Sequence, residues 1–338
     1  MVNFDVEKYR ADGKAVLETI PAIESVVDSI VERGYDNMVV IGIGGTWTEW
    51  NSVIAILRHY TDLPIYLENA AEILVKRDKR YLTPRSIVIT ASVSGDTKEV
   101  LAAAKMCREM GIDVVGFTKS RETPLGKLLT HWIPYTAAGC DNAYMLYFTL
   151  ALYLLSTRGE YGDYGLWKAQ LGGVHEELIR IREEFDPRAR AIARKYHKEP
   201  YNMWVGSGSM WGNVYLFTMC LLEEMQWVRT KAVTSADFFH GTLELVEEGV
   251  PVFLVKGVDE YRPLDQRVEN FIRKYEVTDK LEVLDMADFQ IRCLDDRFRE
   301  IAAVLIFGAT VVDRLSKQYE QFTGHWLQFR RYYRQLDY

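Results

Sequence analysis

The chain has 338 residues, of which 48% are hydrophobic, so it can bury sizeable cores and is expected to form about two domains. Its formal net charge is −7 and it has no dense cluster of Lys and Arg, which argues against a nucleic acid or an anionic membrane as a partner. The four cysteines are far apart in the sequence and include no CxxC pair, so we expect neither a disulfide framework nor a zinc site, and a cytoplasmic location.

Apolar, strand-like runs alternate with helical patterns in the first half of the chain. This βαβα order predicts a parallel sheet with helices on both faces. The polar, glycine-containing stretch 156–173 then interrupts the pattern, and we expect it to be a linker or crossover. The expected strands are 38–43, 65–67, 87–90 and 114–117, and the expected helices are 46–60, 98–110 and 142–155.

The same order begins again after this interruption. The segment 174–198 is helical in pattern, with a break expected at Asp186-Pro187, where Asp can cap one helix and Pro can open the next. The longest apolar stretches, 143–155 and 301–312, are too short to span a bilayer and are expected to be buried helices. The later expected elements are a strand at 202–205, a helix at 213–227, a strand at 252–255 and a helix at 262–275.

The two halves of the chain show weak self-similarity. Residues 39–45 align with residues 203–209, and in both segments the glycines follow a strand. This similarity indicates a repeat at the scale of a domain rather than a solenoid. We therefore predict two related α/β domains, residues 1–160 and 161–338.

The turn 92–97, Ser-Val-Ser-Gly-Asp-Thr, lies between an apolar run and a helical pattern. Such a turn is suited to an anion, because its free N–H groups and the positive end of the helix dipole face one point in space. The hydroxyls of Ser92, Ser94 and Thr97 can add donors at the same point. We expect this turn to bind a phosphate, with ordinary helix capping as the alternative.

A second turn, Gly42-x-Gly44-Gly45-Thr46, also follows a strand and opens a helix. It resembles a dinucleotide fingerprint but lacks the full GxGxxG spacing, and Glu68 is only the nearest candidate for the acid that should end the second strand. Both turns would lie at the carboxyl ends of neighbouring parallel strands, where ligands of open α/β sheets bind. The pair predicts an anion or sugar-phosphate site, and a tight turn without a ligand is the alternative.

Two adjacent glutamates, Glu223 and Glu224, lie in the expected helix 213–227, and His240-Gly241 follows an aromatic pair. Adjacent glutamates are usually a solvated helix face, and a lone histidine is usually a surface or core residue. Glu224 nevertheless follows a strongly apolar run, where a carboxylate would have a raised pKa and would suit general-base work. Glu224 and His240 are therefore candidate catalytic groups. The remaining histidines share no spacing that suggests a metal site.

Together these motifs resemble the sugar isomerase (SIS) family. The turn 92–97 matches its Ser-x-Ser-Gly-x-Thr phosphate loop. Glu224 and His240 match, in identity and spacing, the glutamate and histidine of the isomerase half of glucosamine-6-phosphate synthase. The segment 237–251 is more similar still to the amino-sugar deglycases, typified by fructoselysine-6-phosphate deglycase. The resemblance covers nearly the whole chain and implies two SIS domains, each a parallel sheet flanked by helices in a flavodoxin-like or Rossmann-like three-layer sandwich.

The resemblance also implies which residues form the site. Glu224 and His240 would be catalytic, with the histidine entering from the partner subunit of a homodimer or higher homo-oligomer. No metal or other cofactor, no nucleic acid and no membrane is implied. Trp47, Val93 and Thr242 depart from the family pattern at the pocket wall, which affects the identity of the substrate more than the chemistry. The implied phosphate-binding residues are Gly44, Gly45, Thr46, Ser92, Ser94 and Thr97.

The implied reaction is cleavage of a phosphorylated Amadori product, a fructosamine with an amino acid on C1 and a phosphate on C6. Proton transfer between C1 and C2 would release glucose 6-phosphate and a free amino acid. An aldose–ketose isomerase or an amino-sugar-phosphate deaminase/isomerase would use the same proton shuttle. A sugar-phosphate sensor without turnover is a third reading, but SIS regulators usually carry a helix-turn-helix domain. The residues before Met38 hold only one helical segment and no basic patch.

Overall fold

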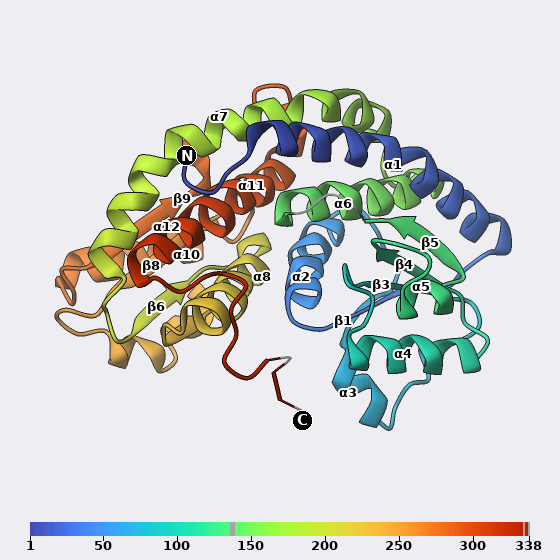
Figure 1. Ribbon diagram of the computed structural model, residues 1–338, viewed down its shortest axis with the longest axis horizontal. Helices are drawn as coiled ribbons and strands as arrows, with labels where there is room; N and C mark the ends of the chain where they lie inside the picture. Colours follow the sequence, from blue (N-terminus) through green and yellow to red (C-terminus); the bar gives the residue numbers. More distant parts are fainter. Residues whose placement is uncertain (136–138, 334, 337–338) are drawn as a thin grey trace. The chain divides into compact units, whose positions relative to one another are not determined.

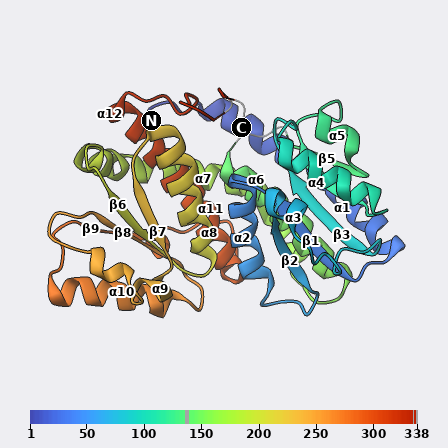
Figure 2. The same ribbon diagram turned by 90° about the horizontal axis from the view of Figure 1, so that it is seen from below.

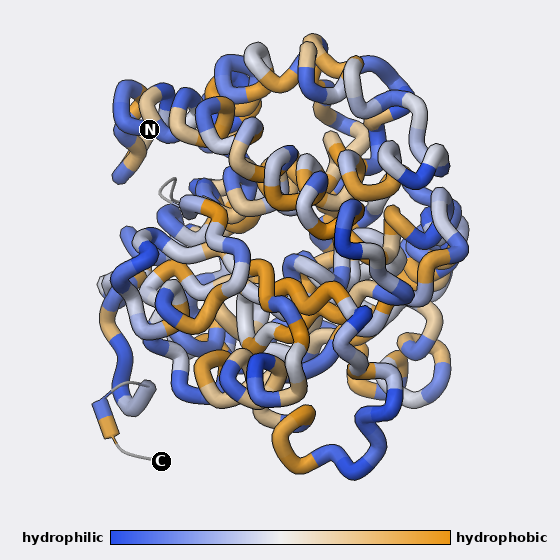
Figure 3. Tube along the Cα trace, turned by 90° about the vertical axis from the view of Figure 1, so that its right-hand side faces the viewer, coloured by the Kyte–Doolittle hydropathy of each residue, from blue (hydrophilic) through white to orange (hydrophobic). Residues whose placement is uncertain are grey.

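The computed structural model describes residues 1–135, 139–333 and 335–336. It confirms the predicted α/β class, because a five-stranded and a four-stranded sheet, both with parallel neighbouring strands, are flanked by helices (Figures 1 and 2). In the trace coloured by hydropathy, apolar and hydrophilic stretches alternate along the chain (Figure 3). None of the helices in the described ranges is both long enough and apolar enough to cross a membrane.

The chain divides into two compact units. Residues Glu7–Gly172 form the amino-terminal unit, and Met1–Val6 together with Gly173–Tyr338 form the carboxyl-terminal unit. Helix α7 (Tyr164–Tyr196) carries the chain from the first unit to the second. The division into domains at residues 160 and 161 stays a prediction.

The amino-terminal unit contains the strands β1 (Asn37–Gly42), β2 (Ile65–Asn69), β3 (Ser86–Ala91), β4 (Val114–Thr118) and β5 (His131–Pro134). Their order in the sheet is β2-β1-β3-β4-β5. The order reverses between β1 and β3, which pair in parallel with Val40 opposite Ile89. In open α/β sheets such a reversal leaves a crevice beyond the carboxyl ends of the two strands, which is the usual place for a ligand.

Helices cover both faces of this sheet. On one face, Val39 and Val88 pack into a core with α3 (Ala70–Val75), α4 (Lys98–Glu109) and α5 (Pro124–Leu128). On the other face lie α2 (Gly45–Leu57) and α6 (Cys140–Thr157). There the ring of Tyr147 stacks on Trp50 at 4.9 Å and meets Phe117 edge-on at 5.2 Å. Helix α1 (Val6–Arg33) is held to α6 by the hydrogen bond of Tyr153 to Asp28, at 2.9 Å.

The carboxyl-terminal unit contains a shorter sheet with the strands β6 (Asn202–Val205), β7 (Thr230–Val233), β8 (Val252–Lys256) and β9 (Leu281–Asp285). Their order is β7-β6-β8-β9, so this sheet repeats the first four positions of the other one. Here too the order reverses between the first strand and the third. The predicted repeat is therefore confirmed at the level of strand order.

Helices again flank this sheet. The α-helices are α8 (Ser209–Tyr215), α9 (Ser235–Phe238), α10 (Arg262–Tyr275), α11 (Arg299–Phe307) and α12 (Ser316–Thr323). Two segments are π-helical, η1 (Leu216–Gln226) and η5 (Gly308–Leu315), and the short 3₁₀ turns are η2 (Thr242–Leu245), η3 (Met286–Asp288) and η4 (Asp296–Phe298).

The core of this unit also has two sides. On one side, β-strand residues such as Met203 and Leu254 pack with Phe238 of α9 and Val268 of α10. On the other side, Trp204 stacks on Phe253 at 4.2 Å and contacts Phe217 of η1 at 4.9 Å. The apolar stretches 143–155, in α6, and 301–312, in α11 and η5, are buried helices as predicted.

Two sequence expectations about the connection between the units were wrong. Helix α6 runs to Thr157 and α7 begins at Tyr164, so the irregular connection is shorter than the predicted 156–173. Pro187 also lies inside α7 instead of at a break. Asp186 does not cap a new helix, because its carboxylate accepts hydrogen bonds from Arg314, at 2.7 Å, and Gln318, at 3.0 Å. The helix continues through Pro187 although proline cannot donate a backbone hydrogen bond.

Candidate active site

The two turns predicted to bind an anion meet at the carboxyl edge of the amino-terminal sheet. Residues 44–46 follow β1 and residues 92–97 follow β3, and these strands are neighbours. The hydroxyl of Thr46 donates a hydrogen bond to the carbonyl of Ala91 at 3.2 Å, which ties the turns together. We call residues 44–46 and 92–97 the anion cradle.

The hydroxyls of the second turn are held in place by bonds within the turn. The Ser92 Oγ accepts a hydrogen bond from the Gly95 N–H at 3.1 Å and lies 3.1 Å from the Thr97 Oγ1. Gly95 has a φ of +69°, and a Cβ there would lie 2.4 Å from the Thr123 Oγ1, so only glycine fits. The Ser94 hydroxyl donates to Asp96, so that hydroxyl must turn before it can bind a ligand.

Both helices that begin in the cradle start without a side-chain cap. Gly44 precedes α2 with a φ of +55° and has no side chain to cap it, and Thr97 precedes α4 without capping it. The first N–H groups of each helix therefore lack an intrahelical partner and lie at the positive end of a helix dipole. An anion bound between the two turns can accept hydrogen bonds from both helices.

Glu49 is a group near the cradle that the sequence did not point to. It lies on α2, about one helical turn after Gly45. Burial raises the pKa of its carboxyl to about 8, so the group is protonated near neutral pH. A neutral Glu49 does not repel an anion held at the start of the same helix, whereas an ionised one would. Its sequence signal is weak, because a single glutamate in a helix is ordinarily solvated.

Glu224 lies near the end of the π-helix η1, which the sequence predicted as an ordinary helix. π-helical turns are rare and are frequent at functional sites. The helix ends at Trp227, a non-glycine residue with a φ of +59°, so the chain turns sharply just after the glutamate. The Glu224 side chain is 27% exposed, and its carboxylate forms an ion pair with Arg330 of the carboxyl-terminal tail, an opposite charge that the sequence did not lead us to expect.

His240 lies in a different part of the same unit. It follows the short helix α9 and is exposed, and its backbone N–H bonds to the carbonyl of Asp237 at 2.9 Å. Glu224 precedes β7 in the chain and His240 follows it. Both residues are described by the structure, and no hydrogen bond or ion pair joins their side chains.

The carboxyl-terminal unit has an equivalent of the anion cradle, but it is filled by the chain itself. Gly208 precedes α8 with φ +55° and ψ −131°, nearly the values of Gly44 before α2, φ +55° and ψ −129°. The carboxylate of Asp259, from the turn after β8, accepts hydrogen bonds from the Ser209 N–H at 2.7 Å and the Ser209 hydroxyl at 2.6 Å. The Asp259 carboxylate thus takes the place at the start of α8 that a bound anion would otherwise take.

A second buried acid lies close to this filled turn. Burial raises the pKa of Asp265 to about 7, and its carboxylate accepts a hydrogen bond from the Ser235 hydroxyl at 2.5 Å. Within the ranges that the structure describes, no group of three His, Cys, Asp or Glu side chains is arranged to hold a metal ion.

Comparison with known proteins identifies similar chains. A family model described as the SIS domain matches residues 35–157, which lie in the amino-terminal unit. Fructosamine deglycase FrlB of Bacillus subtilis (strain 168) is 30% identical over 278 residues, covering 80% of this chain and 82% of that protein. Fructoselysine 6-phosphate deglycase of Escherichia coli (strain K12) is 25% identical over 276 residues, covering 81% of this chain and 80% of that protein.

Solved structures share the whole fold. A Bacillus subtilis protein provisionally described as a phosphosugar isomerase aligns with a TM-score of 0.86 at 23% identity, over 96% of this chain and 100% of that one. A Salmonella typhimurium LT2 protein with the same description aligns with a TM-score of 0.85 at 26% identity, over 95% of this chain and 99% of that one.

Proposed function

Because the chain belongs to the SIS domain family, we propose that it is a deglycase that acts on a phosphorylated Amadori compound. The substrate would be a fructosamine 6-phosphate such as fructoselysine 6-phosphate, and the products would be glucose 6-phosphate and a free amino acid. The relatives at 30% and 25% identity are a fructosamine deglycase and a fructoselysine 6-phosphate deglycase, which favours this reaction within the family.

The observation that carries the proposal is the anion cradle. Two uncapped helix starts and the hydroxyls of Ser92 and Thr97 converge beyond β1 and β3, and a phosphate dianion has the charge and the acceptors that these donors need. Binding the far end of the sugar in this way fixes the position of C1 and C2. Binding energy from the phosphate is then available for alignment of the reacting carbons.

In the proposed reaction, Glu224 acts on the open-chain sugar as a general base. His240 assists ring opening by transferring a proton between the ring oxygen and the C2 hydroxyl. Glu224 then removes a proton from C1, which gives an enaminol, and returns it to C2. This leaves a protonated imine between C1 and the amino acid nitrogen. Water adds to C1, the C–N bond breaks, and the nitrogen leaves with its electron pair and a proton as the free amino acid.

The lack of a hydrogen bond or ion pair between the side chains of Glu224 and His240, both within the described ranges, supports a histidine from a second copy of the chain. In a homodimer, each site would combine the glutamate of one subunit with the histidine of the other. Mixing an inactive Glu224→Gln variant with an inactive His240→Ala variant should then restore activity in the mixed dimers. Failure of this complementation would assign both groups to one subunit.

Arg330 must leave Glu224, or share it, before the carboxylate can remove a proton. The guanidinium bonds to the Glu224 carboxylate and to the Leu327 carbonyl in the structure. We therefore include release of this ion pair as a step of the proposed cycle.

The experiment that tests the function is a product assay on a panel of fructosamine 6-phosphates. A deglycase releases glucose 6-phosphate and the amino acid in equal amounts, and Glu224→Gln should abolish both. An aldose–ketose isomerase, which the description of the similar Salmonella structure favours, would interconvert sugar phosphates without releasing an amine. Isomerisation with no amine release would overturn the deglycase assignment while keeping the family. An unchanged substrate in every assay would indicate a sensor.

A further inference from the structure

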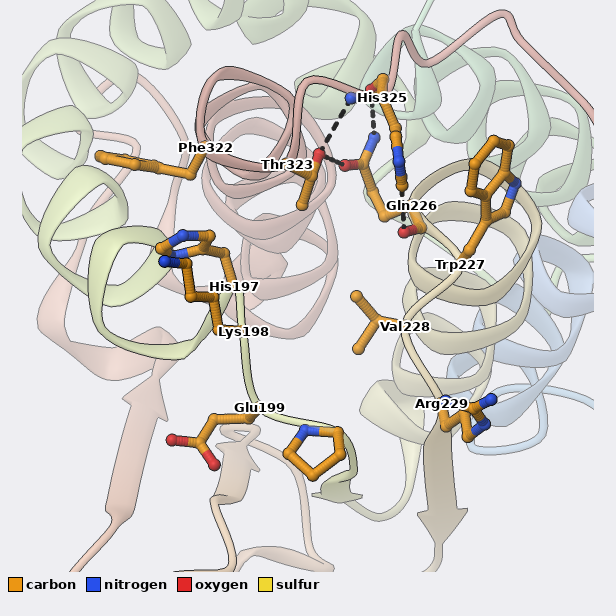
Figure 4. A pocket seen from close by; sticks show the side chains of 11 residues that line it. His197, Lys198, Glu199, Gln226, Trp227, Val228, Arg229, Phe322, Thr323 and His325 are labelled. Atoms are coloured by element: carbon orange, nitrogen blue, oxygen red, sulfur yellow. Dashed lines mark hydrogen bonds between the residues drawn. The ribbon is translucent and has the colours of Figure 1, made fainter.

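A separate cavity lies in the carboxyl-terminal unit, at the end of the sheet where the strands β6 and β7 begin (Figure 4). Its volume is about 320 Å³. The walls are the connection from α7 to β6 at residues 197–200, the turn from η1 to β7 at residues 226–229, and the end of α12 with the start of the tail at residues 322–325. We call this cavity the amino-edge pocket. It is distinct from the carboxyl edge, where ligands of open α/β sheets usually bind.

The rim of the amino-edge pocket is cationic. Lys198 and Arg229 are exposed, and neither has an ion pair among the described residues. Glu199 is the one carboxylate of the lining, and it is already neutralised by Lys280 at 2.7 Å. The net charge offered to a ligand is therefore positive.

Two imidazoles add further polar groups to the pocket. The Nδ1 of His197 lies 3.1 Å from the Ala193 carbonyl and 3.0 Å from the Arg194 carbonyl. The Nδ1 of His325 lies 3.2 Å from the Gln226 carbonyl. Because carbonyls only accept, each Nδ1 carries the proton, and each Nε2 remains for other partners.

The floor of the pocket is apolar and aromatic. Val228 contributes a nearly buried side chain, Phe322 lies against the His197 ring at 5.4 Å, and Trp227 lies against the His325 ring at 4.0 Å. Figure 4 shows Val228 between the His197 side and the Trp227 side of the pocket. A ligand that fits must combine an apolar body with an anionic group, because these two kinds of surface meet in one cavity.

The walls of the pocket are also the parts of the chain that position Glu224. Gln226 and Trp227 end the helix that carries Glu224, and the tail leads from His325 to Arg330, the ion-pair partner of Glu224. The Gln226 side chain joins the two walls, since it donates to the His325 carbonyl at 2.9 Å and accepts from the Thr323 hydroxyl at 2.5 Å. A ligand that fills the pocket must therefore contact the two walls that Gln226 joins.

We propose that the amino-edge pocket binds a small organic anion, a carboxylate or phosphate ester on a short apolar body, and that binding acts on Glu224 through the tail. The bound anion pairs with Lys198 and Arg229 and tightens the Gln226 joint. The tail then holds Arg330 more firmly on Glu224. This site goes beyond the proposed function and does not depend on which reaction the enzyme catalyses.

The binding test uses calorimetry on the full chain with phenyl phosphate and benzoate as probes, which separate the phosphate source of the anion from the carboxylate source. The double variant Ser92→Ala with Thr97→Ala weakens the anion cradle, so binding that survives in it reports the pocket. We expect one probe to bind there with a Kd between about 0.1 and 1 mM. Val228→Trp, which fills the pocket, should weaken this binding at least about tenfold.

Charge variants keep the test valid if Val228→Trp does not fold. Lys198→Gln with Arg229→Gln should weaken binding of the probe as much as Val228→Trp does, because it removes both cations of the rim. Both side chains are exposed, so the double variant leaves the core intact. Lys105→Gln with Lys127→Gln removes two exposed cations from the other unit and should change nothing. Binding of neither probe, or equal binding by pocket and control variants, would overturn the site.

The link to Glu224 is tested by hydrogen exchange of the tail amides at residues 325–330. The probe should slow their exchange in the wild-type chain and leave it unchanged in the pocket variants. A probe that binds in the pocket without changing exchange of the tail would overturn the link to Glu224.

Discussion

The helices α2 and α8, one in each unit, begin with the same backbone turn, but the groups around the turn differ. Gly44 and Gly208 have nearly equal backbone angles, and both precede a helix that follows the first strand of a parallel sheet. In the carboxyl-terminal unit, Asp259 supplies the anion for the helix start, and the turn is closed. In the amino-terminal unit, the turn after the third strand carries the hydroxyls of Ser92 and Thr97 instead, and under the proposed function a phosphate of the substrate would be the anion.

The start of a helix favours an anion, because its first N–H groups lie at the positive end of the helix dipole. In the carboxyl-terminal unit the chain supplies that anion itself, since the Asp259 carboxylate accepts from the Ser209 N–H. In the cradle the carboxylate of Asp96 is bonded to the Ser94 hydroxyl instead. Under the proposed function, the turn of the amino-terminal unit would therefore bind the phosphate, and the turn of the carboxyl-terminal unit would be structural.

The largest effect is expected for Glu224→Gln, which removes the base and keeps the shape of the side chain. The turnover rate should fall by about 10²–10⁴-fold, the usual loss when a general base is removed. The KM should change only a few-fold, because in the proposed function the phosphate is bound by the anion cradle and not by Glu224. Steady-state kinetics with the preferred fructosamine 6-phosphate measure both. Glu223→Gln, on the neighbouring residue, is the matched control, and near-wild-type turnover by Glu224→Gln would remove Glu224 from the role.

The next largest effect is expected for the hydroxyls of the anion cradle. Ser92→Ala with Thr97→Ala removes two hydroxyls that can donate to a phosphate, and hydrogen bonds to charged groups contribute about 1.5–3 kcal/mol each. Binding of the phosphorylated sugar should weaken by about 10²-fold or more, and binding of its unphosphorylated analogue should change little. Calorimetry on the two sugars gives the comparison. An equal loss for both sugars would show that the turn does not bind the phosphate.

Asp265, the buried acid of the carboxyl-terminal unit, should dominate the way in which the stability of that unit depends on pH. The pKa of Asp265 is about 7 in the folded chain, against 3.8 as its ordinary value. The folded state therefore binds the proton more strongly, and stability should fall as the pH rises from about 4 to 7. Asp265→Asn keeps an acceptor for Ser235 and should flatten this fall, by up to about 4 kcal/mol at neutral pH. Urea unfolding at several pH values measures it, and parallel pH curves for the two proteins would contradict it.

A smaller loss of stability is expected when the bonds between Asp259 and Ser209 at the start of α8 are removed. Asp259→Ala leaves the buried Ser209 N–H and hydroxyl without an acceptor, which costs about 1–3 kcal/mol. Asp259→Asn retains an acceptor oxygen and should lose less. Thermal unfolding of the three proteins should give that order. If both variants are as stable as the wild type, the carboxylate is not what stabilises the start of α8.

The smallest effect is expected at Glu49, beside the open turn. Its pKa of about 8 means that it ionises as the pH rises above neutrality, and the new charge repels the phosphate. The KM for the phosphorylated substrate should therefore rise a few-fold between about pH 7 and 9. Glu49→Gln should remove this rise without changing the KM at pH 7. A rise that persists in the variant belongs to another group.

The central strands could be predicted from the sequence, and of the four edge strands only β2 was predicted, as residues 65–67. Strands β1, β3, β4, β6 and β8 are buried along their whole length, so each is a continuous apolar run. The edge strands β5, β7 and β9, which the prediction missed, are largely half-buried and have mixed sequences such as Thr-Lys-Ala-Val. Their pairing with a neighbour decides their structure, and no local pattern records it.

By itself, the sequence determined the α/β class, the repeat and the cradle residues. Each of these depends on a local pattern, either an apolar run or a turn of Gly, Ser and Thr at the start of a helix. Only the folded structure shows that Asp259 fills the second turn and that Arg330 pairs with Glu224. Those relations join residues far apart in the chain, and their energies depend on distance and burial, which a linear pattern does not contain.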